Sequence, residues 1–141
     1  MKFDEMKLGN IYKTKSYKVT REKVIEFAKE FDPQYLHLDE EKAKKGRFKD
    51  IIAPGTHTLS ISMKLWIECD VFGEDLIAGV GMKQVKFIKP VYPGDELHVF
   101  AEATEKIKKN EEAGIITLLL STYNHKDEKV LETEVSALIS A

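Results

Sequence analysis

One stretch near the middle of the chain, residues 56–69, constrains the fold most strongly. Its apolar side chains fall on nearly every face of a helix, and they are Leu59, Ile61, Met63, Leu65, Trp66 and Ile67. A helix that is apolar all round needs protein on every side. The stretch is too short to span a bilayer, which takes about 20 apolar residues. We therefore predict a buried central helix that the rest of the chain must cover.

Strand-like segments that follow this helix supply the cover. They are residues 77–88, 96–107, 115–125 and 130–140, separated by turn-forming residues at 90–95, 108–114 and 124–128. Apolar residues alternate along them, as in Leu97, Val99 and Ala101, so each strand should bury one face. We expect an antiparallel meander, joined by an early strand at residues 11–19.

The segment before the central helix predicts two shorter helices. Thr20 opens the first, whose apolar residues Val24, Phe27, Ala28 and Phe31 follow helical spacing. Pro33 disfavours helical backbone at Asp32, so this helix should end near Phe31. A second helix is expected from Asp39, as N-cap, to Gly46. These bounds place His37 in the loop between the two helices.

Together these elements predict an α+β fold with a curved antiparallel sheet around one helix. The 141 residues match the size of a single domain, so we expect one domain over residues 1–141. A sheet of this kind leaves edges that a partner subunit can pair with or cover. We therefore expect a homodimer or a higher homo-oligomer.

Composition narrows the partners and the compartment. The net charge of -2 comes from 24 acidic and 22 basic residues spread along the chain, which leaves no basic stripe for nucleic acid. The single Cys69 has no disulfide partner and no neighbouring base, so we expect an inert thiol in a reducing compartment. The first 20 residues lack the apolar run of a signal peptide. We expect a cytoplasmic protein without membrane segments.

Three segments carry a resemblance to a known family. They are Phe-Asp-Pro-Gln-Tyr-Leu-His-Leu-Asp at residues 31–39, Ile-Ile-Ala-Pro-Gly at residues 51–55, and Val-Lys-Phe-Ile-Lys-Pro-Val-Tyr-Pro-Gly-Asp at residues 85–95. Together they resemble the MaoC-like dehydratases, which include (R)-specific enoyl-CoA hydratases. The resemblance covers most of the chain and implies a hotdog fold, in which a sheet wraps around a central helix. Residues 90–95 match a turn of the family and are expected to be structural.

The resemblance also implies the catalytic residues. The family has an Asp and a His five residues apart, and Asp32 and His37 keep that step. In the family this pair activates the water that is added to a 2-enoyl thioester, giving an (R)-3-hydroxyacyl thioester of coenzyme A or acyl carrier protein. A water nucleophile needs a base, and the α carbon needs a proton. Gly55 matches the residue whose N–H stabilises the thioester oxygen, as unpaired N–H groups at a helix start can.

Other positions are assigned to substrate binding. Gln34 stands where the family commonly has Asn, and the Pro of the motif has moved to position 33. Relatives often carry a Ser at the position of Met63, so Ser62 or Ser60 takes its role or the hydroxyl is absent. His57, two residues past Gly55, is expected to line the pocket or to cap the helix. The substrate-binding candidates are Gln34, His57, Ser62 and Met63, and no cofactor or metal is expected.

Three alternatives remain open. A metal site built from His37, His57, Asp32 and Asp39 lacks a recognised ligand spacing and is disfavoured. A hotdog thioesterase is the second enzyme class, because one fold hosts both chemistries. Its carboxylate would be Glu68, which lies far from the start of the central helix. The third alternative is a protein that binds acyl thioesters without catalysis.

Overall fold

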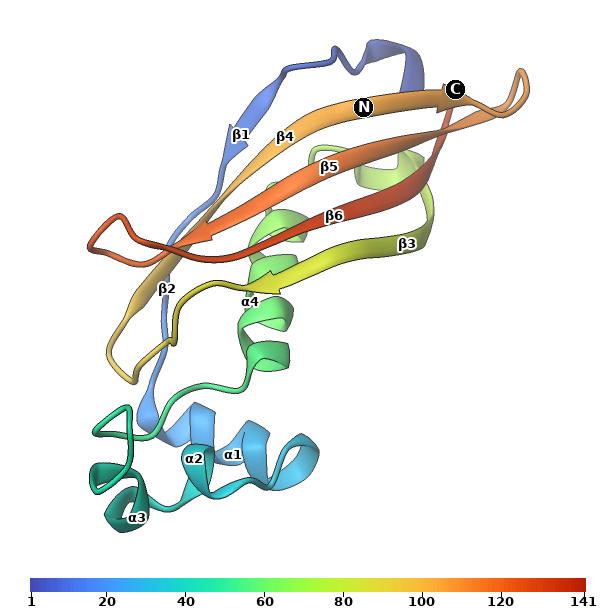
Figure 1. Cartoon of the computed structure of the whole chain (residues 1–141). Helices are drawn as coiled ribbons and strands as arrows, with labels where there is room; N and C mark the ends of the chain where they lie inside the picture. Colours follow the sequence, from blue (N-terminus) through green and yellow to red (C-terminus); the bar gives the residue numbers. More distant parts are fainter.

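The computed structural model describes residues 1–141 as one antiparallel sheet, one long helix and a group of short helices (Figure 1). The helices are α1 (Arg21–Phe31), α2 (Tyr35–Leu38), α3 (Glu40–Lys44) and α4 (Gly55–Glu68), with 3₁₀ turns at Phe3–Glu5 and Gly73–Asp75. The strands are β1 (Ile11–Lys13), β2 (Tyr17–Lys18), β3 (Leu76–Phe87), β4 (Glu96–Lys108), β5 (Ala113–Tyr123) and β6 (Lys129–Ser140). The predicted α+β class is confirmed.

The sheet has the strand order β1-β4-β5-β6-β3, and β2 also pairs with β4. The predicted meander is right for β4, β5 and β6. It is wrong for β3, which pairs with β6 and forms the far edge of the sheet. Alternating apolar residues identify a strand but not the strands with which it pairs. The strand order could therefore not be predicted from the sequence.

The early strand is also broken where one strand was expected. Residues 14–16 separate β1 from β2, and the side chain of Thr14 takes part in the ladder: the N–H of Val99 donates to Thr14 Oγ1 at 2.9 Å. The N–H of Thr14 donates to the carbonyl of Val99 at 3.0 Å. A side-chain oxygen thus accepts the ladder hydrogen bond at the point where the edge strand is interrupted.

The long helix α4 lies against one side of the sheet, as Figure 1 shows. Its residues Ile61, Leu65 and Trp66 belong to a core of 23 buried residues that includes inward-facing residues of β4, β5 and β6. The prediction of a helix over residues 56–69 is confirmed with bounds of Gly55–Glu68. Its flank toward β3 is open in the single chain, where Ile67 is 62% exposed. No helix of the chain has the length and apolar character to cross a membrane.

The short helices gather at the N-terminal end of α4 (Figure 1). Thr20 caps α1 as predicted, because its Oγ1 accepts from the N–H of Lys23 at 3.2 Å. Asp39 likewise caps α3, accepting from the N–H of Lys42 at 3.1 Å. The expectation that His37 lies in a loop is wrong, since it sits in the single turn of α2. That turn starts at Gln34, whose side chain makes no capping bond, so no capping pattern marked it.

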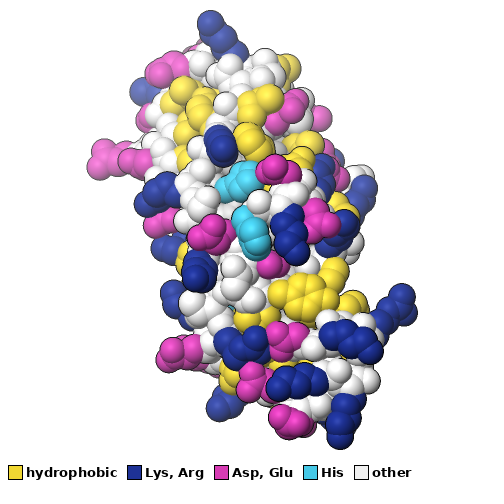
Figure 2. Space-filling view, turned by 90° about the vertical axis from the view of Figure 1, so that its left-hand side faces the viewer, with side chains coloured by type: hydrophobic (Ala, Val, Ile, Leu, Met, Phe, Trp, Pro, Cys, Tyr) yellow, Lys and Arg dark blue, Asp and Glu magenta, His cyan; other side chains and the backbone are white.

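Charges of both signs are mixed over the surface. Figure 2 shows one face of the molecule, on which Lys and Arg side chains alternate with Asp and Glu side chains. No continuous basic stripe crosses this face, in keeping with the nearly balanced composition.

Candidate active site

Three of the predicted residues come together where α1 ends. Pro33 has no N–H to extend the helix, so Asp32 closes it, donating its own N–H to the carbonyl of Ala28 at 2.9 Å. Oδ2 of Asp32 lies 3.4 Å from Nε2 of His37. Oδ1 accepts from Nε2 of Gln34 at 2.6 Å. The turn after Pro33 therefore brings together a carboxylate, an imidazole and an amide that holds the carboxylate.

The ring of His37 is fixed by the main chain. The residue is only 4% exposed, and its Nδ1 lies 2.6 Å from the carbonyl oxygen of Ile52. A carbonyl oxygen can only accept, so Nδ1 carries a hydrogen. In the neutral ring, Nε2 is then the free acceptor. Ile52 also donates its N–H to the carbonyl of Leu36 at 2.9 Å. The backbone of Ile52 is therefore bonded both to the ring of His37 and to the residue that precedes His37.

Nε2 of His37 and the carboxylate of Asp32 therefore present two acceptors to one small space. Their separation of 3.4 Å is longer than a strong charge-assisted hydrogen bond of about 2.8 Å, so neither group is fully engaged by the other. A molecule with two O–H donors, such as water, satisfies both. The same pair can take a proton from that molecule and return it, which is general acid-base chemistry.

The start of α4 provides the complementary electropositive group. Pro54 is the N-cap and Gly55 the first residue of this 14-residue helix. The N–H groups of Gly55 and Thr56 donate to no acceptor in the protein, whereas those of His57 and Thr58 donate to the carbonyl of Pro54. Free N–H groups at a helix start, together with the helix dipole, favour a negatively charged oxygen.

Position 55 has no room for a side chain while the ring of Phe87 stays where it is. A Cβ added there would lie 2.7 Å from two atoms of the Phe87 ring, closer than real Cβ contacts allow. The ring comes from the last residue of β3 and packs directly against the backbone at the helix start. Any larger residue at position 55 would have to displace it.

A cavity of about 360 Å³ lies between His37 and the start of α4, and Asp32 is not among the residues that line it. It is lined by His37, Gly55 and Thr58 on one side, and by Phe48 and Phe87 among its apolar walls. The structure thus places the imidazole, the first residue of α4 and one hydroxyl around a single space. A mostly apolar cavity with a few convergent polar groups is typical of a small-molecule site.

The predicted residue His57 lies elsewhere. Its ring stacks on Phe27 of α1, with centroids 4.5 Å apart and planes 13° apart, and it is not among the residues that line the cavity of His37. The side chain is 6% exposed and its Nδ1 has no hydrogen-bond partner. Burial, and to a lesser degree the charge of Lys23, lowers the pKa of His57.

Ser62 and Met63 also lie outside this cavity. Oγ of Ser62 donates to the carbonyl of Thr58 at 2.8 Å and shares a hydrogen bond of 2.7 Å with Oγ1 of Thr122, which links α4 to β5. Ser60 is exposed and donates to the carbonyl of Thr56. Met63 lines a separate apolar cavity of about 600 Å³ between α4 and β3, together with Trp66. The hydroxyl that does line the cavity of His37 belongs to Thr58.

The residues of the alternative sites are also dispersed. Glu68, the thioesterase candidate, pairs with Lys64 at 3.1 Å near the end of α4 opposite Gly55. No three His, Cys, Asp or Glu side chains are grouped as metal ligands. Burial raises the pKa of the Cys69 thiol.

Three residues of the site were not predicted from the sequence, and of these only Thr58 had a signal there. Ile52 acts through its carbonyl, so its side chain reveals nothing about the role. Phe87 resembles any apolar strand residue, and only the folded sheet brings it to Gly55. Thr58 could have been predicted to lie beside Gly55, because residues three apart on a helix share a face and Thr58 follows Gly55 by three.

An antiparallel sheet packed against one long central helix defines the hotdog-fold class. The chain belongs to the family of the MaoC like domain, whose family model matches residues 5–124. The uncharacterized protein YdeM of Bacillus subtilis is 57% identical over 139 residues, which cover 99% of each chain. The resemblance seen in the sequence is therefore confirmed.

Solved structures agree with this assignment. A MaoC-like dehydratase from Rhodospirillum rubrum has a TM-score of 0.87 at 28% identity, covering 99% of this chain and 97% of that chain. The R-hydratase PhaJ1 from Pseudomonas aeruginosa has a TM-score of 0.77 at 23% identity, covering 99% and 84%. The second likeness concerns the fold alone. The predicted hotdog fold is confirmed.

Proposed function

We propose that this protein is a hydratase that adds water to the double bond of a 2-enoyl thioester, giving the (R)-3-hydroxyacyl thioester, and catalyses the reverse dehydration. One observation carries the proposal. The free acceptor Nε2 of His37 and the carboxylate of Asp32 converge 3.4 Å apart, and His37 lines one cavity with the unpaired N–H group of Gly55. Membership of the MaoC like family supports it.

The proposed reaction uses each of these groups once. Water donates its hydrogens to His37 and Asp32, and its oxygen attacks C3 of the enoyl group while one of the two bases takes the proton. The π electrons move through C2 onto the thioester oxygen, where the N–H of Gly55 stabilises the negative charge. The carbon C2 then takes up the proton on the same face, the carbonyl re-forms, and both bases are restored.

The other predicted residues have supporting roles in this proposal. Gln34 holds one oxygen of Asp32 so that the other faces His37. Met63, in the apolar cavity beside α4, contacts the acyl chain of the substrate. Ser62 supports the helix from which the cavity is built, and His57 supports its first turn. The thioester carrier is coenzyme A, with acyl carrier protein as the second candidate.

We further propose a homodimer formed through β3. This strand pairs with β6 on one side only and is exposed along its whole length. It carries large apolar side chains that are 37–59% exposed, namely Leu76, Ile77, Val80, Met82, Val85 and Phe87. An unpaired, apolar edge strand of this kind is a template for a second strand. A second copy would also cover Ile67 on the open flank of α4.

The test is incubation with crotonyl-CoA while enoyl absorbance and free thiol are followed together. Loss of enoyl absorbance without thiol release supports hydration. We expect Asp32→Asn and His37→Ala each to lower kcat by about a hundred- to ten-thousand-fold, the usual worth of general acid-base catalysis. His125→Gln is the matched control, because His125 is an exposed histidine that does not line the cavity.

Each other outcome contradicts the proposal in a defined way. Release of thiol alone would indicate a thioesterase, and neither signal would indicate a binding protein. Turnover near that of the wild type in folded Asp32→Asn would remove Asp32 from the mechanism.

A further inference from the structure

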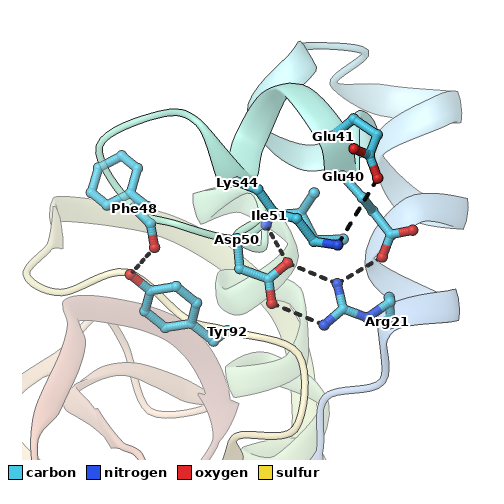
Figure 3. Close-up of polar contacts among 8 residues, drawn as sticks. All are labelled: Arg21, Glu40, Glu41, Lys44, Phe48, Asp50, Ile51 and Tyr92. Atoms are coloured by element: carbon cyan, nitrogen blue, oxygen red, sulfur yellow. Dashed lines mark hydrogen bonds and ion pairs between the residues drawn. The ribbon is translucent and has the colours of Figure 1, made fainter.

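A three-way ionic contact holds the segment that precedes Gly55. Arg21, the first residue of α1, donates from Nη1 and Nη2 to the two carboxylate oxygens of Asp50, both at 2.9 Å (Figure 3). Nη1 also donates to Oε1 of Glu40 in α3 at 2.8 Å. A two-pronged contact between guanidinium and carboxylate fixes orientation as well as distance. Arg21 therefore joins α1, α3 and the connection between α3 and α4.

This contact lies two residues from the group that orients His37. Oδ1 of Asp50 accepts from the N–H of Ile51 at 2.8 Å, and Ile51 is fully buried. The next residue, Ile52, provides the carbonyl that accepts from Nδ1 of His37 at 2.6 Å. The chain of contacts thus runs from Arg21 through Asp50 and the backbone to the imidazole.

The segment is held from its other side as well. The hydroxyl of Tyr92 donates to the carbonyl of Phe48 at 3.0 Å, as Figure 3 shows. Between the two tethers, Lys49 has a φ of 67°, in the left-handed region that a residue with a Cβ rarely adopts. Such a backbone persists only where its surroundings enforce it. The contacts of Phe48 and Asp50 are the ones that flank this bend.

We propose that the pair of Arg21 and Asp50 is a positioning element for His37, which keeps the carbonyl of Ile52 in place and thereby keeps the hydrogen on Nδ1. The proposal rests on the proposed hydratase function for its catalytic consequence. If the carbonyl of Ile52 moves away, Nδ1 loses its acceptor and the other tautomer becomes populated. Its Nε2–H then donates to Asp32 and no longer accepts a hydrogen from water.

The surroundings of the pair fit this role better than a role in stability. The side chains of Arg21 and Asp50 are 44% and 29% exposed, and ion pairs at such sites add little to the free energy of unfolding. The hydrogen bond from Arg21 lowers the pKa of Asp50, and the same bond raises the pKa of Arg21. Both groups are therefore charged at neutral pH.

The kinetic test compares Asp50→Asn and Arg21→Gln with the wild type. We expect kcat for crotonyl-CoA hydration to fall by about 10- to 100-fold, the usual loss when a partner that orients a metal-ligating histidine is removed. KM should change by less than about threefold, because neither Arg21 nor Asp50 lines the cavity of His37. Arg21→Lys should recover little of the kcat, since an ammonium cannot make the two-pronged contact.

Two controls separate positioning from the general loss of an ion pair. Glu40→Gln leaves the contact between Arg21 and Asp50 in place and should keep a kcat near that of the wild type. Lys64→Gln removes the exposed pair of Lys64 and Glu68 on α4 and should leave kcat unchanged. A fall in kcat of equal size in either control would overturn the proposal.

A second measurement does not depend on activity. The ¹⁵N shifts of the His37 ring, assigned by their loss in His37→Ala, report which nitrogen carries the hydrogen. We expect hydrogen on Nδ1 in the wild type and a mixture of tautomers in Asp50→Asn and Arg21→Gln. An unchanged tautomer in the folded variants would overturn the proposal. If Asp50→Asn does not fold by circular dichroism, Arg21→Lys, which keeps the charge, decides in its place.

This measurement also distinguishes the two proposals. If wild-type protein does not hydrate crotonyl-CoA but the tautomer responds to Arg21→Gln, the proposed function fails and the positioning of His37 stands. If hydration is observed and neither kcat nor the tautomer responds, the positioning proposal fails alone.

Discussion

His57 is a buried imidazole in the first turn of α4 that leaves one ring nitrogen without a partner. Its Nδ1 makes no hydrogen bond, and the side chain is 6% exposed. Burial lowers the pKa of His57 below its ordinary value of 6.5. The folded protein therefore keeps this ring neutral, whereas the unfolded chain takes up a proton near pH 6.5. Stability is lost as the pH falls below that value.

Replacement of His57 by Phe tests this reading. His57→Phe keeps an aromatic ring beside Phe27 and removes the unpaired polar atom, so we expect the free energy of unfolding to rise by about 1 kcal/mol at neutral pH. The gain should grow below pH 6.5, because the variant has no proton to take up on unfolding. Urea unfolding at two pH values measures both effects. Lower stability would contradict the expectation, and a loss of hydration would indicate contact with substrate.

Gly55 can be probed through its contact with Phe87. We expect Gly55→Ala to lower both stability and kcat, because the added Cβ meets the ring at 2.7 Å and either the Phe87 ring or the helix start must shift. Phe87→Ala removes the obstacle, so the double variant should recover much of the stability that Gly55→Ala loses. Urea unfolding of the two single variants and the double variant gives the coupling. Additive losses would show that the ring does not set the requirement for glycine.

At the level of single residues, the sequence identified the polar pair but not its surroundings. Asp32 follows from a helix that Pro33 must end, and His37 from the five-residue step shared with the family. The roles of Ile52 and Phe87 come from contacts between segments far apart in the chain. Contacts of this kind cannot be predicted from a local sequence pattern. Ser62 and His57 adjoin the expected positions, but side-chain packing turns them toward β5 and α1.

At the level of elements, a buried pair of hydroxyl groups joins the long helix to the sheet. The hydroxyl of Ser62 donates to the carbonyl of Thr58, so Oγ1 of Thr122 is the donor in the 2.7 Å bond between the two side chains. Both residues are fully buried. The bond thus links the middle of α4 to β5 in a region without water to replace it.

Ser62→Ala is expected to lower the free energy of unfolding by about 1–2 kcal/mol, because it leaves the hydroxyl of Thr122 without an acceptor. Adding Thr122→Val, which has the same shape without the hydroxyl, should recover part of the loss. Chemical denaturation of the single and double variants measures this. A single variant as stable as the wild type would show that Thr122 finds another acceptor.

The elements themselves were more predictable than their neighbours. Helix α4 and strands β4 to β6 follow from apolar periodicity, which reports how one element is buried. Apolar periodicity does not predict that β3 pairs with β6 or that α2 forms a single turn, because both depend on which surfaces meet after the chain has folded. Periodicity contains no information on that pairing.

At the level of the whole molecule, β3 is an edge strand that pairs with another strand on one side only. All twelve residues of the strand are exposed, and an apolar cavity of about 600 Å³ lies between it and α4. Light scattering after size exclusion should give twice the chain mass of 16.1 kDa. Val80→Asp places a charge on this edge and should shift the protein toward monomer. Leu8→Asp is the matched control, since Leu8 is 59% exposed near the opposite edge of the sheet.

A monomeric wild-type protein would contradict the dimer. Equal effects of Val80→Asp and Leu8→Asp would place the interface elsewhere.

The position of Phe87 has a consequence for the kinetics of dilute solutions. The residue ends the strand proposed to pair with a second copy, yet its ring touches Gly55 and lines the cavity of His37. The ring of Phe87 therefore connects the edge of the sheet to the backbone at Gly55, whose N–H is proposed to donate to the thioester oxygen. Turnover per subunit should then decline on dilution below the dissociation constant of the dimer, although each subunit contains its own Asp32, His37 and Gly55.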